Sequence, residues 1–415
     1  MSKNNKNKLV PKLRFPEFTM DSEWKQNDLG VLCQYWNGAS HESGVCDDGN
    51  YFLISLNSID INGNLKNEIK RISYTDNSLK TNDLVMVLSD VAHGNFLGLT
   101  DIIPNDKYVL NQRMAGLRIK DLNEANPQFI RYYINKSQKY FKSKGQGSSQ
   151  LNLSKSAVTD FPVLKPPKLR EQQKIAACLS SLDEVITAES QKLDVLKDHK
   201  KGLQQNLLPQ AGETVPKFRF KEFEDSVEWK ETTLTQVADY ENGKAHEQDI
   251  ADDGEFIVVN SKFISQDGEV KKYTNTAFLP ATKGDVLMVL SDIPNGKAIA
   301  KCFLVEEDNR YTVNQRICRI TPRNVNSKIL YYLLNRNPYF LAFDDGVKQT
   351  NLRKEEVLNC PLLIPEDPKE QEKIADTLSS VDDLIIAQNQ KLEALQLHKK
   401  GLLQGLFPNV NEVTE

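Results

Sequence analysis

The sequence has little cysteine, and its cysteines lack the spacing of a metal site or a disulfide framework. Six are present among 415 residues, with no Cys-x-x-Cys pair and no His-x-x-x-His companion. A zinc site or a redox motif needs such spacing, so these residues favour reduced thiols in a cytosolic protein. They are Cys33, Cys46, Cys178, Cys302, Cys318 and Cys360.

Long hydrophobic runs are also missing. No apolar stretch approaches the roughly 20 residues that a membrane-spanning helix needs. The first ten residues, MSKNNKNKLV, are basic and polar, and no apolar segment follows them, so we expect no secretory signal. We therefore expect a cytoplasmic protein that does not contact a membrane.

Catalytic motifs are absent as well. There is no Asn/Asp-Pro-Pro-Tyr/Phe motif for base methylation, no G-x-x-x-x-G-K-S/T phosphate loop and no G-x-G-x-x-G. Gly145-Gln146-Gly147 follows a predicted helix and lacks the third glycine. His41 and His246 each precede a glutamate, but a hydrogen-bonding role in a loop fits them better than a metal or catalytic pair. An autonomous nuclease or methyltransferase is therefore disfavoured, and we expect no metal site.

An excess of positive charge is lacking too. The chain has 53 Lys and Arg against 57 Asp and Glu, a net charge of −4. This balance argues against a uniformly basic nucleic-acid binder, but it leaves room for local basic patches and for protein partners. A hydrophobic content of 39% with 27% charged residues is typical of a folded protein, and the length allows two to four domains.

What the sequence does contain is one leucine-spaced helix, present twice. LSSLDEVITAESQKLDVLKDHKKGL (179–203) returns as LSSVDDLIIAQNQKLEALQLHKKGL (378–402). In both copies the seam positions, most of them apolar, recur at alternating steps of three and four, which is the heptad seam of a coiled coil. A seam needs a partner helix to bury it, so we expect the two helices to pair. The predicted interface consists of Leu182, Ile186, Leu193, Leu196, Leu203, Val381, Ile385, Leu392, Leu395 and Leu402.

The repeat extends far beyond the helix. PKLRFPEF (11–18) returns as PKFRFKEF (216–223), and VMVLSD (85–90) returns as LMVLSD (287–292). The chain is therefore a tandem duplication of a unit much larger than a solenoid repeat. We predict an α+β fold with two globular heads, each followed by a long helix. The predicted segments are a first head at 1–165, a helix at 166–209, a second head at 210–364, a helix at 365–409 and a tail at 410–415.

The patterns also predict elements and a helix register. Strands are expected within 51–58, 83–90 and 115–122, and one helix over 127–145. The first long helix is expected from about Lys168 to about residue 207. A pseudo-twofold relation between the copies would make the long helices antiparallel. We predict a register in which Glu189 faces Lys399, because their opposite charges favour it over a shift by one heptad.

Several of these features resemble the specificity subunit of Type I restriction–modification systems. They are the tandem layout, the LSSLDEVI…QKL…L…HKKGL helix, and the W-K-x-x-x-L and Q-x-N-L segments, and the resemblance covers essentially the entire chain. It implies that each head is a target-recognition domain that reads one half of a split sequence in double-stranded DNA. It also implies that the helices space the heads and dock two methyltransferase subunits, with restriction (translocase) subunits joining through the assembled complex. S-adenosylmethionine, ATP and Mg²⁺ would then be bound by partner subunits, and no cofactor by this chain.

The duplication helps to sort the candidate DNA contacts. A residue identical in both copies cannot by itself distinguish two half-sites, so the shared Ser-Asp (89–90, 291–292) and Gln-Arg (112–113, 315–316) pairs fit scaffold or phosphate roles. The arginines would alternatively pair with the aspartates. Base readout is expected where matching loops differ, at 91–96 against 293–297 and at 142–150 against 344–349. The candidate DNA-binding residues are His93, Asn95, Arg113, Lys142, Lys144, Gln146, Ser148, Ser149, Gln150, Asn295, Lys297, Arg316, Lys348 and Gln349, and there are no candidate catalytic residues.

A second interpretation remains open on the residues alone. A coiled-coil scaffold that assembles proteins and binds no DNA would account for the seams and the acidic balance. It does not explain why each helix comes with a head built to the same plan. A DNA-recognition subunit without catalytic activity explains both features.

Overall fold

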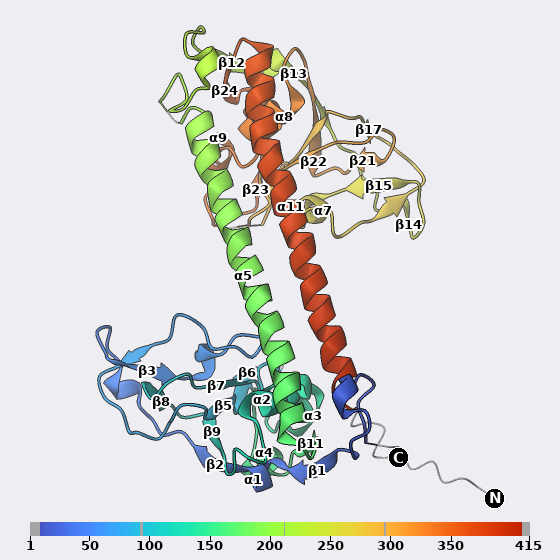
Figure 1. The fold of residues 1–415 in the computed structure, drawn as a ribbon. Coiled ribbons are helices and arrows are strands. Elements are labelled where there is room, and N and C mark those ends of the chain that lie inside the picture. Colours follow the sequence, from blue (N-terminus) through green and yellow to red (C-terminus); the bar gives the residue numbers. More distant parts are fainter. Residues whose placement is uncertain (1–8, 92–93, 211, 294–295, 409–415) are drawn as a thin grey trace, which may run out of the picture. The chain divides into compact units, whose positions relative to one another are not determined.

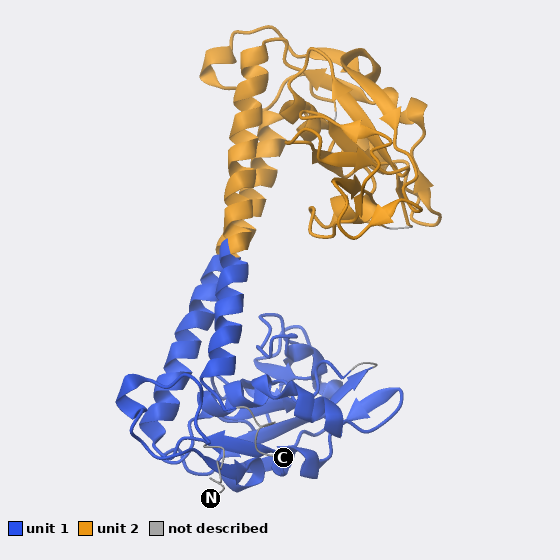
Figure 2. Cartoon of the chain, turned by 90° about the vertical axis from the view of Figure 1, so that its right-hand side faces the viewer, with its two compact units in different colours: residues 1–190, 391–415 blue, residues 191–390 orange. Residues whose placement is uncertain are grey.

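The computed structural model describes residues 9–91, 94–210, 212–293 and 296–408, and the chain divides into two compact units. Unit 1 comprises residues 1–190 and 391–415, and unit 2 comprises residues 191–390. Each unit contains one head of mixed helices and strands together with one half of each long helix (Figures 1 and 2). In the ranges above, no helix has the length and apolar character to cross a membrane.

The two long helices lie within the predicted segments, 166–209 and 365–409. α5 runs from Leu169 to Leu207 and α11 from Pro368 to Gly405, lengths of 39 and 38 residues. Gly202 lies inside α5 and does not end it, because an interior glycine costs only about 1 kcal/mol while the apolar seam continues. Proline at the start of α11 is suited to that place, since the first helical N–H has no acceptor within the helix.

The helix halves within each unit run antiparallel, but their register differs from the prediction. In unit 1, Glu189 pairs with Lys391 at 2.5 Å and Asp183 with Lys399 at 2.5 Å. Lys399 therefore faces Asp183 and not Glu189, so the predicted pairing was wrong by about one heptad. Unit 2 repeats the second pair, with Lys200 at 2.5 Å from Asp382.

The observed register forms more ion pairs between the helices than the predicted register would. The predicted register sets Lys399 against Glu189, but in the other copy it sets Lys200 against the neutral Gln388. The observed register gives an aspartate–lysine pair in both copies. The head also fixes these aspartates, because Tyr132 donates a hydrogen bond to Asp183 at 2.7 Å and Tyr332 donates one to Asp382 at 2.6 Å.

This register leads to a cross-linking prediction within unit 1. The two ion pairs place Ile186 and Leu395 midway between them, facing each other. The double variant Ile186→Cys/Leu395→Cys should form a disulfide under mild oxidation, seen as a mobility shift on a non-reducing gel. Ile186→Cys/Leu402→Cys is the matched control, because the predicted register would join that pair. Cross-linking of the control in place of the first pair would contradict the observed register.

The head of unit 1 is built around a four-stranded antiparallel sheet of order β2-β9-β5-β7, next to a three-stranded sheet of order β4-β3-β8 in which β3 and β8 are parallel. Strands β1 and β11 form a separate antiparallel pair. The strands are β1 Lys25–Asp28, β2 Cys33–Asn37, β3 Tyr51–Ile54, β4 Arg71–Ile72, β5 Leu84–Val87, β6 Ser89–Val91, β7 Thr100–Ile102, β8 Tyr108–Leu110, β9 Met114–Ile119, β10 Gln150–Asn152 and β11 Pro162–Lys165. The helices before α5 are α1 Leu29–Leu32, α2 Pro127–Lys136, α3 Gln138–Lys144 and α4 Lys155–Thr159.

The head of unit 2 repeats this plan. Its four-stranded sheet has the order β13-β22-β18-β20, and its second sheet has five strands in the order β14-β16-β15-β21-β17. The strands are β12 Lys230–Thr233, β13 Ala238–Asn242, β14 Ile250–Ala251, β15 Phe256–Val259, β16 Tyr273–Thr274, β17 Pro280–Ala281, β18 Val286–Val289, β19 Ser291–Asp292, β20 Cys302–Leu304, β21 Tyr311–Val313, β22 Ile317–Pro322, β23 Thr350–Asn351 and β24 Pro361–Ile364. The helices before α11 are α6 Leu234–Val237, α7 Ser261–Ser265, α8 Ser327–Leu334, α9 Pro338–Leu341 and α10 Lys354–Leu358.

The apolar run at 84–87 forms β5 because both faces of this strand are buried. Leu84 and Met86 pack into the core that includes α2, while Val85 and Val87 pack into the core that includes β3 and β8. In unit 2, β18 is likewise shared between two cores. A strand covered on both sides reads as a continuous apolar run instead of an alternating one.

The helix predicted over 127–145 is divided at Ser137 into α2 and α3. The Ser137 side chain donates a hydrogen bond to the Tyr133 carbonyl at 2.8 Å, four residues back. Such a bond competes with the backbone ladder and favours a bend in a helix. The apolar face continues on both sides of the break, which is why periodicity alone did not reveal it.

Each head is fastened to its long helix by a buried carboxylate. In unit 1, Arg14 donates two hydrogen bonds to Glu171 at 2.8 Å each, and the Trp24 indole donates a third at 3.3 Å. In unit 2, Arg219 and Trp229 bind Glu370 at the same distances. The head strands that follow Trp24 and Trp229 are thereby held at the first turn of α5 and of α11.

Candidate nucleic-acid interface

The loops predicted to contact DNA are brought together in each unit by a short two-stranded ribbon. In unit 1, β6 pairs antiparallel with β10, so the loop that follows β6 lies beside the loop that precedes β10. In unit 2, β19 pairs with β23 in the same way. The strands of the ribbon in unit 1 are separated by about 60 residues of sequence, so only the fold could show that the loops are neighbours.

Polar side chains hold each ribbon together. Ser89 donates a hydrogen bond to Asn152 at 2.6 Å across the first ribbon, and Gln349 donates one to Ser291 at 2.7 Å across the second. Ser89 and Ser291 are thus scaffold residues, one of the two roles predicted for them. The Q-x-N-L segments, 150–153 and 349–352, supply the second strand of each ribbon. Sequence reasoning missed Asn152 and its counterpart Asn351, although that shared motif contained both.

The shared arginines lie at the turn next to the ribbon. The Leu88 amide donates to the Arg113 carbonyl at 3.0 Å, and the Leu153 amide donates to the Leu88 carbonyl at 2.8 Å. This chain of bonds places Arg113 beside β6 and β10. Arg316 has the equivalent position, since the Leu290 amide donates to its carbonyl at 2.9 Å.

Both arginine side chains are exposed, and neither has a hydrogen-bond or ion-pair partner within the described part of the chain. The alternative pairing with the shared aspartates is not observed. Asp90 accepts hydrogen bonds from the backbone amides of Val91 and Phe96, and Asp292 accepts them from Ile293, Ala298 and Ile299. The aspartates therefore anchor the loops, and the two guanidinium groups stay available for an anionic partner.

The remaining predicted residues surround the ribbons. Lys142 joins the two loops of unit 1 by donating a hydrogen bond to Asn95 at 2.7 Å, and Lys144 lies over the Tyr140 ring at 5.7 Å. Burial raises the pKa of the Tyr140 hydroxyl. His93 and Asn295 lie outside the described residues. The other candidates in the differing loops are exposed, apart from the half-buried Gln150: they are Gln146, Ser148, Ser149, Lys297, Lys348 and Gln349.

One glycine is required by the turn that leads into β10. Gly147 has φ +123°, and a Cβ added there would lie 2.1 Å from the Gln150 carbonyl oxygen. Only glycine adopts this backbone region at low cost. Gly147 is therefore a structural residue of the loop and not part of a cofactor-binding motif.

The two histidines have structural hydrogen bonds, as predicted. His41 is buried, with Nδ1 at 3.0 Å from the Tyr74 hydroxyl, and His246 is buried, with Nε2 at 3.0 Å from Thr312 Oγ1. Among the residues that the structure describes, no group of His, Cys, Asp and Glu side chains is arranged to hold a metal ion.

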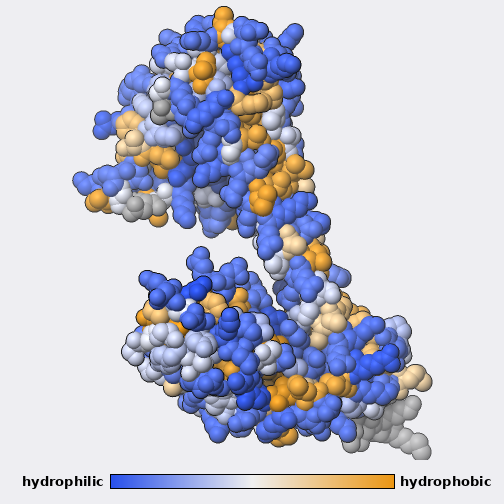
Figure 3. Space-filling model, turned by 60° about the vertical axis from the view of Figure 1, so that its left-hand side comes forward, coloured by the Kyte–Doolittle hydropathy of each residue, from blue (hydrophilic) through white to orange (hydrophobic). Residues whose placement is uncertain are grey.

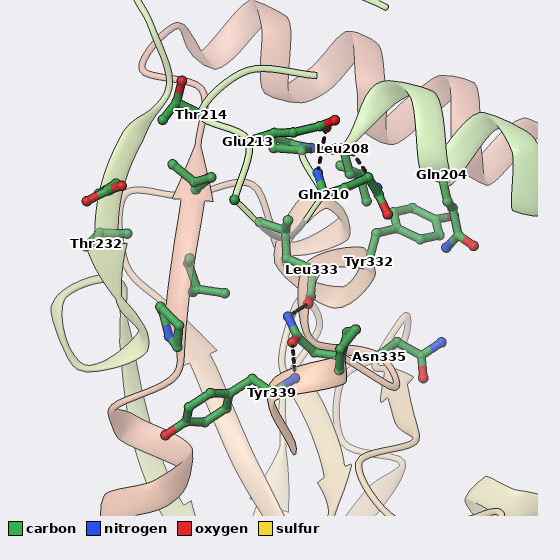
Figure 4. Close-up of a pocket in the computed structure, with 18 of the residues that line it drawn as sticks. Gln204, Leu208, Gln210, Glu213, Thr214, Thr232, Tyr332, Leu333, Asn335 and Tyr339 are labelled. Carbon is green, nitrogen blue, oxygen red and sulfur yellow. Dashed lines mark hydrogen bonds between the residues drawn. The ribbon is translucent and has the colours of Figure 1, made fainter. Parts of the chain in front are cut away.

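A pocket of about 1100 Å³ lies elsewhere in unit 2, between the end of α5, β12, β24 and α8 (Figure 4). Tyr332, Leu333 and Tyr339 line it together with amide side chains such as Gln204 and Asn335. None of the predicted DNA-binding residues is among its lining residues. The pocket is thus separate from the ribbon surface.

Comparison with known proteins agrees with this architecture. A family model described as Type I restriction modification DNA specificity domain matches residues 21–198 and 226–397. The chain is 23% identical over 416 residues to the Type I restriction enzyme MjaVIII specificity subunit of Methanocaldococcus jannaschii, covering 95% of this chain and 93% of that protein.

Two solved structures share the fold. One is the S subunit of a Type I restriction–modification system from M. genitalium, with a TM-score of 0.67, 16% identity, and coverage of 97% of this chain and 100% of that one. The other comes from work on complex assembly and conformational transition of the type I R-M system, with a TM-score of 0.54, 16% identity, and coverage of 93% and 98%. Because the family model matches two segments that together span most of the sequence, this chain belongs to the family of Type I restriction–modification DNA specificity proteins and carries two specificity domains in tandem.

Proposed function

We propose that each head reads one half of a bipartite site in double-stranded DNA through its ribbon and the loops around it. The observation that carries the proposal is an arrangement present in both heads: a β-ribbon, a loop anchored by an aspartate, and an exposed arginine beside them. The major groove of B-DNA admits a two-stranded β-ribbon, and amide side chains match the hydrogen-bonding edges of the bases. Arg113 and Arg316, which the copies share, are assigned to phosphates, and the loops that differ are assigned to bases.

The helices are proposed as the spacer and as the docking platform for two methyltransferase subunits. Several large apolar side chains on the long helices stay outside the seam and exposed, among them Val185 and its counterpart Leu384 at 44% and 55%. The face shown in Figure 3 is mostly hydrophilic, with apolar side chains interspersed on it. A subunit docked on the helices would bury these apolar groups and so gain hydrophobic stabilisation. Restriction subunits would join through the assembled complex.

We further propose that this chain has no catalytic activity of its own. The sequence has no methylation motif and no phosphate-binding loop. S-adenosylmethionine, ATP and Mg²⁺ are accordingly assigned to the partner subunits, and the role of this chain is to select the site on which they act.

Exchanging one loop tests this proposal. Residues 91–96 are replaced by the sequence of residues 293–297, and the methylation motif of the assembled complex is mapped. The half-site read by the first head should change, while the other half-site and the spacer length stay the same. The reciprocal exchange is the matched control and should change only the other half-site. An unaltered motif would contradict base readout by these loops, and an altered spacer would mean that the helices do not set the spacing.

A further inference from the structure

An aliphatic side chain stands exposed at the same place on both ribbons. Val91 ends β6, and Ile293 directly follows β19. Each is 69% exposed. A β-branched apolar residue in a strand normally packs against neighbours on the sheet surface, but these two leave most of their surface in solvent.

The backbone of both residues is nevertheless fixed. The Val91 amide donates a hydrogen bond to Asp90 Oδ1 at 2.8 Å, and the Ile293 amide donates one to Asp292 Oδ1 at 2.9 Å. The same aspartates also bind amides further along the loop. Each aliphatic group is therefore presented outward from an anchored backbone, at low entropic cost for a contact.

A glutamine accompanies each aliphatic residue. Gln150 lies directly opposite Val91 in the antiparallel register of β6 and β10. In unit 2, Ile293 and Gln349 each lie one residue beyond the paired residues of β19 and β23, which are Ser291 with Asn351 and Asp292 with Thr350. Directly opposed residues in antiparallel strands project from the same face of the sheet. Each ribbon thus has one aliphatic and one amide side chain at this end. In the protein alone the amides donate hydrogen bonds within the ribbons, from Gln150 to Asn152 at 3.3 Å and from Gln349 to Ser291 at 2.7 Å.

This pair matches one base pair in the major groove. Thymine is the base that carries a methyl group there, and an aliphatic side chain is its apolar partner, while the amide of glutamine pairs with N6 and N7 of adenine. We propose that Val91 and Ile293 contact the C5-methyl group of a thymine, each beside the glutamine that faces the paired adenine. This inference rests on the proposed function and extends it to named residues and a named base pair.

The shared pair has a consequence for the site. Because both ribbons carry it, both half-sites contain an A·T pair at the equivalent position. The loop residues that differ between the copies then read the neighbouring base pairs, which gives the two half-sites their separate sequences.

The test removes single methyl groups from the DNA. The chain is assembled with its methyltransferase partner, and its affinity is measured for duplexes in which each thymine of the mapped site is replaced in turn by deoxyuridine. One replacement in each half-site should weaken binding by about fourfold, the effect of burying one methyl group. With Val91→Ala, the replacement in the first half-site should have no further effect, while the replacement in the second keeps its effect. Ile293→Ala should give the opposite result.

Val31→Ala and Val227→Ala are matched controls, because those valines are 60% and 65% exposed and lie outside the ribbons. They should leave every deoxyuridine effect unchanged. The proposal is overturned if no single replacement weakens binding, or if Val91→Ala and Ile293→Ala weaken binding equally to thymine and deoxyuridine duplexes. A complex with no sequence-specific binding at all would overturn the proposed function together with this inference, and the two failures are thereby told apart.

Discussion

Replacing Glu171 with alanine is expected to lower the free energy of unfolding by about 3–5 kcal/mol, because the change leaves a charged group buried without its partner. The Glu171 side chain is 1% exposed, and that of Arg14 is 8% exposed. The hydrogen bonds from Arg14 to Glu171, the largest cause, raise the pKa of the arginine in the intact protein. An arginine side chain is effectively always protonated, so the guanidinium stays charged when the carboxylate is removed. The Trp24 indole N–H is then left without its acceptor as well.

Urea titration followed by tryptophan fluorescence measures this destabilisation. Glu370→Ala should have a similar effect in unit 2, because Arg219 and Trp229 bind Glu370 in the same way. Glu17→Ala is the matched control, since the pair of Glu17 with Lys174 is exposed and should change the unfolding midpoint little. If Glu171→Ala is no less stable than Glu17→Ala, the buried carboxylate does not fasten the head to the helix.

Replacing both Arg113 and Arg316 with alanine is expected to weaken DNA binding by about 100-fold, or about tenfold for each charge-assisted hydrogen bond to a phosphate. Both guanidinium groups are exposed beside the ribbons, and within the described ranges neither has a partner in the protein. If they bind phosphates, each substitution should also reduce the slope of log K against log salt by about 0.9. Sequence preference should not change, because phosphate contacts carry no sequence information directly.

The measurement is a salt titration of binding to specific and non-specific duplexes by the chain assembled with its methyltransferase partner. Arg170→Ala is the control, since Arg170 is an exposed arginine at the start of α5 and belongs to neither ribbon. An unchanged salt slope in the Arg113/Arg316 variant would show that these residues do not bind phosphate. Weaker binding to one DNA sequence only would instead assign them to base readout.

Much of the fold could be predicted from the sequence because the two copies of the repeat can be compared with each other. Apolar spacing shared by 179–203 and 378–402 located both long helices, and α5 ends at Leu207 as the continued seam required. The apolar run at 84–87 gave a buried strand. Loops where the copies differ gave candidate readout segments, and the structure places those loops beside one another.

What could not be predicted depends on contacts distant in sequence. The helix register was wrong because one charge match was weighed without the tyrosines of the heads, which hold Asp183 and Asp382. The pairing of β6 with β10 joins strands of three residues, too short for any periodicity to reveal. The break at Ser137 arises from one side-chain hydrogen bond inside an unbroken apolar pattern. The roles of Asp90 and Asp292 were left open for a similar reason. The sequence does not distinguish an aspartate that accepts hydrogen bonds from backbone amides from one that pairs with an arginine.

The most direct test of the account is to map base methylation across the genome of a host that carries this gene with its methyltransferase partner, and of the same host with the gene deleted. If this chain selects the site, a split motif of two short half-sites at a fixed spacing is methylated in the first strain and unmethylated in the second. Identical methylation in both strains, with the partner present and active, would contradict DNA recognition by this chain and favour a coiled-coil scaffold that binds proteins only.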